Sequence, residues 1–483
     1  MKRALYALIA VATIGIATLN VSCKKEATDE FEVPSDSILI EMNMPLGAEG
    51  TTSFVSHNIA SISAVSEPKG WEVTKIDMYR KEITVRSPKS FDDGEVKSGN
   101  ITLTGYTALG ADTSVTIYVA ILENEDIDYS NAPANCYIAN KPATRFLFNP
   151  YRGGGNGEVE LNTDHIELIW ESTEELINFI DMRDGKASLY LQPIKDDNGE
   201  FTDKVVTGNA LIGAYDANDK LIWSWHIWVT NSDPTTDTID LNGKALMNIN
   251  LGADCNSEGD HERVGDSYGM YYQWGRRTPI VGPNTWNFAL NEDKLTYNSD
   301  GLIVRLQYTE STADSGTAKW AEDNPTTMIV GNKDNAYDWL YEGHDELWSA
   351  TEKSEHDPCP AGWRVPDSSI YEGLTISSVD DAMAWQEAQK MYGWHLVDAA
   401  GGSFFFTAQG RRNYLDGHLD IVNDDATRPI PWSGYYWTAT TTDDGRASAM
   451  FFDLNSATRT WNGFEASRAM YRANALPIRC VRE

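Results

Sequence analysis

Residues 357–366 read DPCPAGWRVP and hold a cysteine between two prolines. Pro358 and Pro360 fix their own φ angles and bias their neighbours towards extended backbone. Cys359 therefore lies on a stiff, extended segment, which suits a residue that must meet a distant partner. A second cysteine close to a proline, Cys480, occurs in PIRCVRE at the carboxyl end of the chain.

The cysteine count favours disulfides. The chain has five cysteines, and the four that follow Cys23 allow three pairings. We expect Cys359 to pair with Cys480, because both lie on proline-flanked extended backbone at the two ends of one sequence unit. In the chain-entropy model, a closed loop of about 100 residues stabilises a fold by roughly 4–5 kcal/mol. The alternative is two buried free thiols.

The first 22 residues have the pattern of a lipoprotein signal peptide. A basic Lys2–Arg3 pair precedes an apolar stretch at residues 4–19, which is short for a membrane span of about 20 residues. The following NVSC resembles a lipobox, although Asn20 stands where leucine is usual. We therefore predict residues 1–22 to be a signal peptide and Cys23 to be lipidated. The alternative is an ordinary secretory signal with an incidental Cys23.

The segment after the signal peptide predicts the location of the protein. Residues 23–34 lack periodicity and indicate a tether, and the KKEATDEFE within it resembles the export tags of surface lipoproteins in Bacteroidetes-type bacteria. Acyl chains such as palmitate can hold a soluble body at a membrane, so we expect a lipid-anchored protein of the cell outer membrane that faces the exterior. The net charge of −33 repels nucleic acid and excludes it as a partner.

Short alternating segments predict a β-sandwich at residues 35–122. ILIEMNM, KEITVRS, GNITLTGY and SVTIYVAIL alternate apolar and polar residues and are separated by turn residues. The order of Trp71 and the last three of these segments resembles the BACON-type immunoglobulin-like domains of surface carbohydrate-system lipoproteins. An acidic linker, ENEDIDYSNAP at residues 123–133, follows.

A second β-rich module is predicted at residues 134–240. HIELIW, KASLYLQP and LIWSWHIWV read as strands, and STEELINFI fits a strand better than the alternative, a helix. In LIWSWHIWV, Trp223 and Trp225 share one face, whereas His226 and Trp228 share the other. We favour a strand buried on both faces with His226 hydrogen-bonded inside. The alternative is an aromatic platform that stacks on sugar rings.

Residues 241–483 form the last predicted unit. Residues 283–356 lack regular patterns, so we expect them to wrap around a core, with scattered tryptophans fastening the wrap: Trp286, Trp320, Trp339 and Trp348. Asp367 can cap a short helix, and a longer helix is expected over residues 379–391, before strands that run to the end of the chain.

Several of these motifs together resemble a known family. DPCPAGWRVP, GYYWTATT and LPIRCVRE are similar to the Fibrobacter succinogenes major paralogous domain, and GKALMNINLGA, YGMYYQWGRRTP and ELWSATEKSEHDPCPAGW are similar to the upstream parts of its long form. The family is found in surface lipoproteins and looks related to the C-type lectin-like fold. The resemblance implies a multidomain, mainly β protein with an immunoglobulin-like sandwich, a second β module and a C-terminal α+β C-type lectin-like domain.

The resemblance also raises two questions about residues. Cys136 and Cys255 would tie the middle module to the lectin-like region if they formed a second disulfide; either could instead be a buried small hydrophobe. Sugar-binding C-type lectins hold calcium with EPN or QPD and WND motifs, but here the corresponding strand reads TWNGF, with Gly463 in place of the last aspartate. Calcium needs six to eight oxygen ligands, so the motifs do not support it, and we predict no cofactor.

Enzymatic and metal motifs are absent from the sequence. The chain contains no GxSxG elbow, HExxH, CxxC, P-loop or GxGxxG. His226 lacks a second histidine at metal-ligand spacing. We therefore predict no catalytic residue and no metal site, and we expect a protein that is not an enzyme.

The predicted function is recognition or adhesion at the cell surface. The expected ligand is a glycan or a surface protein, and the candidate contacts are aromatic residues at turns or strand edges of the C-terminal domain: Trp432, Tyr435, Trp461 and Phe464. These residues could instead fill the core. Two other classes compete, a structural subunit of a surface fibre or complex and a divergent glycan-processing hydrolase.

Overall fold

The computed structural model describes residues 29–33, 37–42, 44–258, 261–284, 292–376, 392–420, 433–455 and 460–483. Strands account for 44% of the residues and helices for 4%, which confirms the prediction of a multidomain, mainly β protein. The one α-helix among the described residues is α1 (Ala318–Asp323). No helix in the described part of the chain is long and apolar enough to span a membrane.

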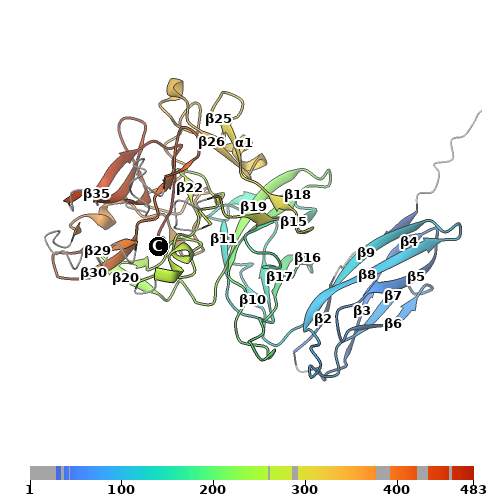
Figure 1. Ribbon diagram of the computed structural model, residues 1–483. Coiled ribbons are helices and arrows are strands. Elements are labelled where there is room, and N and C mark those ends of the chain that lie inside the picture. The colour runs from blue at the N-terminus through green and yellow to red at the C-terminus, as the bar shows by residue number, and fades with distance from the viewer. Residues whose placement is uncertain are drawn as a thin grey trace, which may run out of the picture.

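The amino-terminal part is a two-sheet sandwich (Figure 1). One sheet has the order β2 (Ser37–Ile40), β9 (Asp112–Ile121), β8 (Ser98–Thr107) and β5 (Ile59–Ser66). The other has the order β3 (Glu49–Ser53), β7 (Glu82–Arg86) and β6 (Glu72–Asp77). Their alternating apolar residues meet in one core, which includes Trp71, Ile83, Val85, Leu103 and Ile117.

The tether is shorter than predicted. β1 (Glu30–Glu32) pairs with β4 (Val55–His57), and Phe31 is only 5% exposed, with its ring 5.8 Å from that of Phe54. The sandwich therefore begins before residue 35, because one aromatic residue in the charged segment is buried in its core. Cys23 lies outside the described residues.

The second module contains two further sheets. One has the order β10 (Ile127–Asp128), β12 (Thr144–Phe148), β17 (Lys186–Leu191) and β16 (Phe179–Arg183). The other has the order β11 (Cys136–Ala139), β19 (Leu221–Val229), β18 (Gly208–Tyr215), β15 (His165–Glu171), β23 (Thr296–Tyr297) and β24 (Ile303–Val304). β10 belongs to the segment predicted to be a linker, so this segment is part of the module. A turn separates β15 from β16. STEELINFI therefore does not form a helix, and the favoured prediction of a strand is wrong for residues 172–178 and holds only from Phe179.

β19 is buried on both faces, as predicted. Trp223 and Trp225 belong to the core between the two sheets of the second module. Trp228 belongs to a different core, which the six-stranded sheet shares with the C-terminal region. His226 lies on the same face as Trp228 and is 1% exposed. Its Nε2 is 2.8 Å from Asn209 Oδ1, and its Nδ1 is 3.1 Å from the Tyr272 hydroxyl.

The burial of His226 predicts a loss of stability in acid. Burial lowers the pKa of His226 to about 3, so below a pH of about 6.5 the unfolded chain binds a proton that the folded chain does not. His226→Gln keeps hydrogen-bonding groups but removes this titration. The stability gap between the wild-type protein and the variant should therefore shrink by about 2 kcal/mol between pH 7.5 and pH 5, as measured by urea unfolding.

A second substitution in the same strand serves as the control. Trp225→Phe removes no titratable group, so its cost should be the same at both pH values. A gap between wild type and His226→Gln that does not change with pH would contradict a neutral buried imidazole.

The C-terminal region consists of small sheets around two large cores and a smaller one. The sheet that holds the chain terminus has the order β20 (Thr238–Leu241), β21 (Lys244–Met247), β37 (Val481–Arg482) and β27 (Trp363–Arg364). A second has the order β22 (Tyr272–Gln273), β36 (Ala475–Leu476), β31 (Arg411–Arg412) and β32 (Leu419–Asp420). The others comprise β25 (Gln307–Glu310) with β26 (Thr327–Val330), β28 (Thr375–Ile376) with β29 (Gly393–Val397) and β30 (Ser403–Thr407), and β33 (Ser433–Thr441) with β34 (Ala447–Asn455) and β35 (Thr460–Met470).

Cys359 and Cys480 form the predicted disulfide across 121 residues. The strands that follow them, β27 and β37, pair in antiparallel fashion. The opening motif also reaches the second module, because Pro360 bridges to Cys136 at the start of β11. The disulfide therefore lies where three distant segments meet.

The second disulfide, one of two alternatives left open for Cys136 and Cys255, does not form. Cys136 and Cys255 are free thiols. Cys136 is 1% exposed and packs in the core beside the Cys359–Cys480 pair, whereas the Cys255 thiol lies 3.8 Å from the Arg263 carbonyl oxygen. The alternative of a buried small hydrophobe holds for Cys136.

The wrap is fastened by tryptophans. Trp339 and Trp348 are each 1% exposed and belong to the core that contains the disulfide, and Trp320 packs against this core. Trp286 lies outside the described residues. Asp367 caps the predicted short helix, a 3₁₀ helix at Ser368–Tyr371, by accepting a hydrogen bond from Ser369 N. The longer helix expected over residues 379–391 lies outside the described residues.

Candidate functional site

The amino-terminal sandwich is packed against the second module through a small apolar cluster. Ala120 and Leu122 from the end of the sandwich contact Phe179 and Tyr190 of the second module. The Phe179 and Tyr190 rings stack with their centroids 5.2 Å apart, and the Tyr190 hydroxyl donates to the Ile121 carbonyl at 3.0 Å. Figure 1 shows β2 and β9 reaching towards β16 and β17.

Polar contacts fasten the same junction. Arg183 Nη2 donates to the Ser37 carbonyl at 2.7 Å and to its hydroxyl at 2.8 Å, and the Ser37 hydroxyl donates to Asp181. Ser98 donates to Gln192 at 2.7 Å. Because buried hydrogen bonds are directional and costly to break, the two bodies are held in a defined orientation.

A cleft of about 1150 Å³ lies beside this junction. β8 and β9 contribute one wall, β15 and the turn after it the other, and the 298–301 turn closes one end. The lining side chains are mostly hydroxyls, amides and carboxylates, among them Asn100, Glu167, Glu174, Asn178, Gln192 and Ser299. Four of the lining residues are glutamates and none is lysine or arginine, so the lining carries carboxylates and neither an ammonium nor a guanidinium group.

The glutamates of the cleft have different roles. Glu171 is 5% exposed and accepts hydrogen bonds from Glu175 N at 2.8 Å and Ile177 N at 3.1 Å, which shape the turn after β15. Burial raises the pKa of Glu171. Glu167, Glu174 and Glu175 are exposed, and these three side chains can contact a ligand.

His165 lies at the rim of the cleft, packed against Tyr215. Their rings are stacked, with centroids 5.3 Å apart and planes 8° apart. Three carboxylates surround the imidazole: Asp164 at 3.2 Å from Nδ1, Glu167 at 3.7 Å from Nε2 and Asp219 at 3.9 Å from Nε2.

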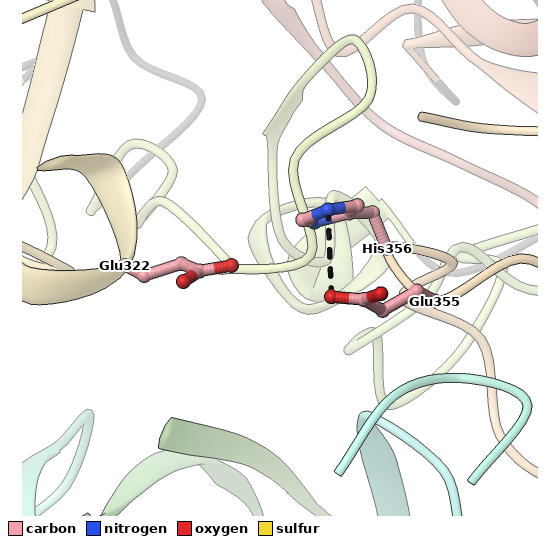
Figure 2. Close-up of side chains that lie close together, drawn as sticks. All are labelled: Glu322, Glu355 and His356. Carbon is pink, nitrogen blue, oxygen red and sulfur yellow. Dashed lines mark ion pairs between the residues drawn. The ribbon is translucent and has the colours of Figure 1, made fainter. Parts of the chain in front are cut away.

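A second group of titratable side chains lies where α1 approaches the segment before the disulfide. Each of Glu322, Glu355 and His356 offers one ligand atom, and these atoms lie within 4.8 Å of one another (Figure 2). Burial lowers the pKa of His356 to about 4, and Arg277 contributes in the same direction. The imidazole is therefore neutral at pH 7. It lies 3.8 Å from Glu355 Oε1.

The predicted aromatic contacts do not form one platform. In the sheet β33–β34–β35, Tyr435 pairs with Phe451, whereas Phe464 pairs with the next residue, Phe452. Because successive residues of a strand point to opposite faces, Tyr435 and Phe464 lie on opposite sides of the sheet. Both are half-buried and pack against different cores.

The other two predicted contacts lie partly or wholly beyond the described residues. The Trp461 backbone is in β35 opposite Leu454, and its side chain is not among those described. Trp432 lies outside the described residues altogether. Tyr435 and Phe464 were candidate contacts singly, and the strand register places them on opposite faces, so a single ligand cannot contact both on one face of this sheet.

Neither the cleft nor the Glu322–Glu355–His356 group was predicted from the sequence. Their residues come from segments that are far apart in the chain and carry no shared motif. One signal was available: HIELIW begins with half-buried His165 and exposed Glu167 on one face and buried Ile166 on the other, which indicates a polar surface next to a buried one.

No family model matches the chain, and no curated protein matches it. Among solved structures, it is similar to the D00–D0 domain of intimin, with 10% identity and a TM-score of 0.17 over 41% of this chain and 96% of that one. It is also similar to the Bacteroides ovatus mixed-linkage glucan utilization locus protein SGBP-B, with 10% identity and a TM-score of 0.12 over 40% of this chain and 43% of that one. A third similar structure is the human desmocollin-1 ectodomain, with 10% identity and a TM-score of 0.16 over 57% of this chain and 57% of that one. Likenesses at these scores carry no argument about function.

Proposed function

We propose that the protein is a glycan-binding lipoprotein of the cell surface, whose ligand occupies the cleft between the amino-terminal sandwich and the second module. The observation that carries this proposal is the polar lining of a cleft of about 1150 Å³. Pockets for drug-like ligands are mostly apolar, whereas this lining offers acceptors and donors to a ligand rich in hydroxyl groups.

The charge of the lining selects among glycans. Glutamates without any lysine or arginine in the lining repel uronic acids and sulfated sugars and tolerate neutral ones. Carboxylates form strong hydrogen bonds with hydroxyl donors. The proposed ligand is therefore a neutral oligosaccharide.

The membrane anchor belongs to the same proposal. Lipidation at Cys23 would leave a short charged segment before β1, which places the sandwich and the cleft near the membrane and the C-terminal region further out. Metabolic labelling with a palmitate analogue, compared between the native chain and Cys23→Ser, tests the anchor independently of the ligand.

The ligand is tested with the full chain carrying Cys23→Ser. A glycan array should show neutral oligosaccharides bound in preference to acidic ones. In calorimetry with the best ligand, Asn100→Ala should weaken binding by roughly tenfold or more, since it removes a hydrogen bond worth about 1.5 kcal/mol. Glu174→Gln should weaken binding less, because the amide keeps an acceptor oxygen but loses the charge that strengthens the hydrogen bond.

The matched control for the cleft variants is Glu342→Gln, an exposed glutamate of the C-terminal region, which should leave affinity unchanged. A preference for acidic glycans, or binding that both cleft variants leave intact, would contradict the location. Binding of a surface protein and no glycan would favour the other ligand class.

A structural subunit of a surface assembly is the second candidate, supported by β5. This strand lies at the edge of its sheet, has no charged residue and exposes Val65 at 63%. Uncharged edge strands can pair with another chain. β5 also contains two register shifts, between Ile59 and Ser61 and between Ala64 and Ser66, and such bulges disfavour edge-to-edge pairing. Concentration-dependent growth of particles in light scattering would favour assembly over glycan binding.

A further inference from the structure

We propose that Glu322, Glu355 and His356 form a binding site for a divalent transition metal of the zinc class. This site is separate from the glycan cleft and does not depend on the function proposed above. It combines the last turn of α1 with two residues that precede the disulfide motif (Figure 2).

The donor atoms fit zinc better than calcium. An imidazole nitrogen with two carboxylate oxygens is a ligand set that zinc accepts, leaving a fourth position for a small ligand. Calcium prefers six to eight oxygens. The ligand atoms lie within 4.8 Å of one another, and a zinc site with bonds of about 2.0–2.2 Å needs separations of roughly 3.4 Å. The exposed side chain of Glu355 would have to rotate towards the other two ligand atoms to reach this separation.

Arg277 provides a second, independent observation. Its side chain is 2% exposed and lies over the Trp223 ring at 3.4 Å, and its Nη1 donates to Glu322 Oε1 at 2.6 Å. One carboxylate oxygen of Glu322 is therefore held. The other, Oε2, lies 4.0 Å from the Nζ of Lys319, whose side chain is 57% exposed, so a metal would replace this exposed ammonium group. Hydrogen bonds of this kind orient metal-ligating carboxylates. Arg277 Nε and Nη2 are buried and have no acceptor in the described part of the chain, and an anionic ligand on the metal would supply one.

The charges of the cluster also fit a cation. Among the described residues, neither lysine nor arginine forms an ion pair with Glu355, whose recorded ionic contact is with His356. The two cations near the cluster, Arg277 and the exposed Lys319, both pair with Glu322, so the carboxylate of Glu355 is the one left to a bound cation.

The backbone of both consecutive ligands is fixed by other elements. The Glu355 carbonyl accepts hydrogen bonds from Asn135 Nδ2 at 2.7 Å and Gly155 N at 2.8 Å. The His356 carbonyl accepts one from Trp348 Nε1 at 2.9 Å. The cost of ordering these ligands is therefore met by folding rather than by metal binding.

Untagged full-length protein carrying Cys23→Ser, stripped with a chelator, tests the site. Titration with Zn²⁺ in a calorimeter should show one saturable site, and Co²⁺ should give visible absorption bands typical of nitrogen and oxygen ligands. His356→Ala and Glu355→Gln should each weaken Zn²⁺ binding by about 100-fold, and Ca²⁺ should not compete at equal concentration.

His165→Ala is the matched control. His165 also has carboxylates near it, Asp164 at Nδ1 and both Glu167 and Asp219 at Nε2. In the described part of the chain, however, only the ligand atoms of Glu322, Glu355 and His356 all lie within 4.8 Å of one another. The loss of His165 should leave Zn²⁺ affinity unchanged. Circular dichroism and the unfolding midpoint without metal show whether each variant is folded; Glu322→Gln, which keeps an acceptor for Arg277, serves if His356→Ala does not fold. The absence of saturable Zn²⁺ binding, or binding that is lost in His165→Ala but kept in His356→Ala, would overturn the site.

Discussion

Replacing Cys359 and Cys480 together with alanine is expected to lower the free energy of unfolding by about 4–5 kcal/mol. The disulfide closes a loop of 121 residues, and in the chain-entropy model a loop of this length strongly restricts the unfolded chain. Both cysteines are fully buried, so the loss should appear as a large fall in the urea midpoint of the C-terminal region. Dithiothreitol should produce a similar fall in the wild-type protein.

The free cysteine at position 255 serves as the control for the disulfide. Cys255→Ala removes a thiol that closes no loop, so it should change stability by less than about 1 kcal/mol and leave the effect of dithiothreitol intact. If the double variant and the reduced protein unfold like the oxidised wild type, the disulfide does not stabilise this region.

Asp357→Ala is expected to cost about 3–5 kcal/mol. The Asp357 carboxylate is fully buried and accepts hydrogen bonds from Cys359 N at 2.9 Å and Val365 N at 2.8 Å. It also pairs with Lys353 Nζ at 3.0 Å, and the Lys353 side chain is 7% exposed. Removing the carboxylate would leave a buried ammonium group without its counter-charge and two amides without acceptors. Equilibrium unfolding in urea measures the loss.

An exposed ion pair provides the matched control for this prediction. Asp128 and Lys186 lie 2.5 Å apart, and both side chains are 37% exposed, so Asp128→Ala should cost less than about 1 kcal/mol. Adding Lys353→Met to Asp357→Ala should recover part of the loss, because the uncompensated charge is then gone. Equal costs for Asp357→Ala and Asp128→Ala would contradict the role of Asp357 in holding the motif.

Local sequence patterns predicted the parts of the fold that depend on local chemistry. The proline-flanked positions of Cys359 and Cys480 indicated their disulfide. The alternation of LIWSWHIWV indicated a strand buried on both faces, and the tryptophans of the irregular segment indicated buried anchors. In each case the side chain and its nearest neighbours in sequence decide the outcome.

The parts that failed depend on register and on contacts between distant segments. Tyr435 and Phe464 looked equivalent in sequence, but a one-residue difference in pairing places them on opposite faces. Phe31 looked like part of a tether until its pairing with β4 buried it. The cleft and the Glu322–Glu355–His356 group join residues that no short motif connects, so only the folded chain shows them.

The six-stranded sheet of the second module has one core on each face. The core that this sheet shares with the C-terminal region includes Trp228 of β19 and the Cys359–Cys480 disulfide. A recombination breakpoint near residue 240 would therefore separate the two sides of this shared core, and each resulting protein fragment would expose an apolar face. The amino-terminal sandwich encloses its own core, so a breakpoint after Leu122 would leave that core intact and disrupt the smaller junction cluster at Phe179 and Tyr190. Evolution is thus expected to diversify the sandwich side of the cleft by shuffling, and the remainder only by substitution.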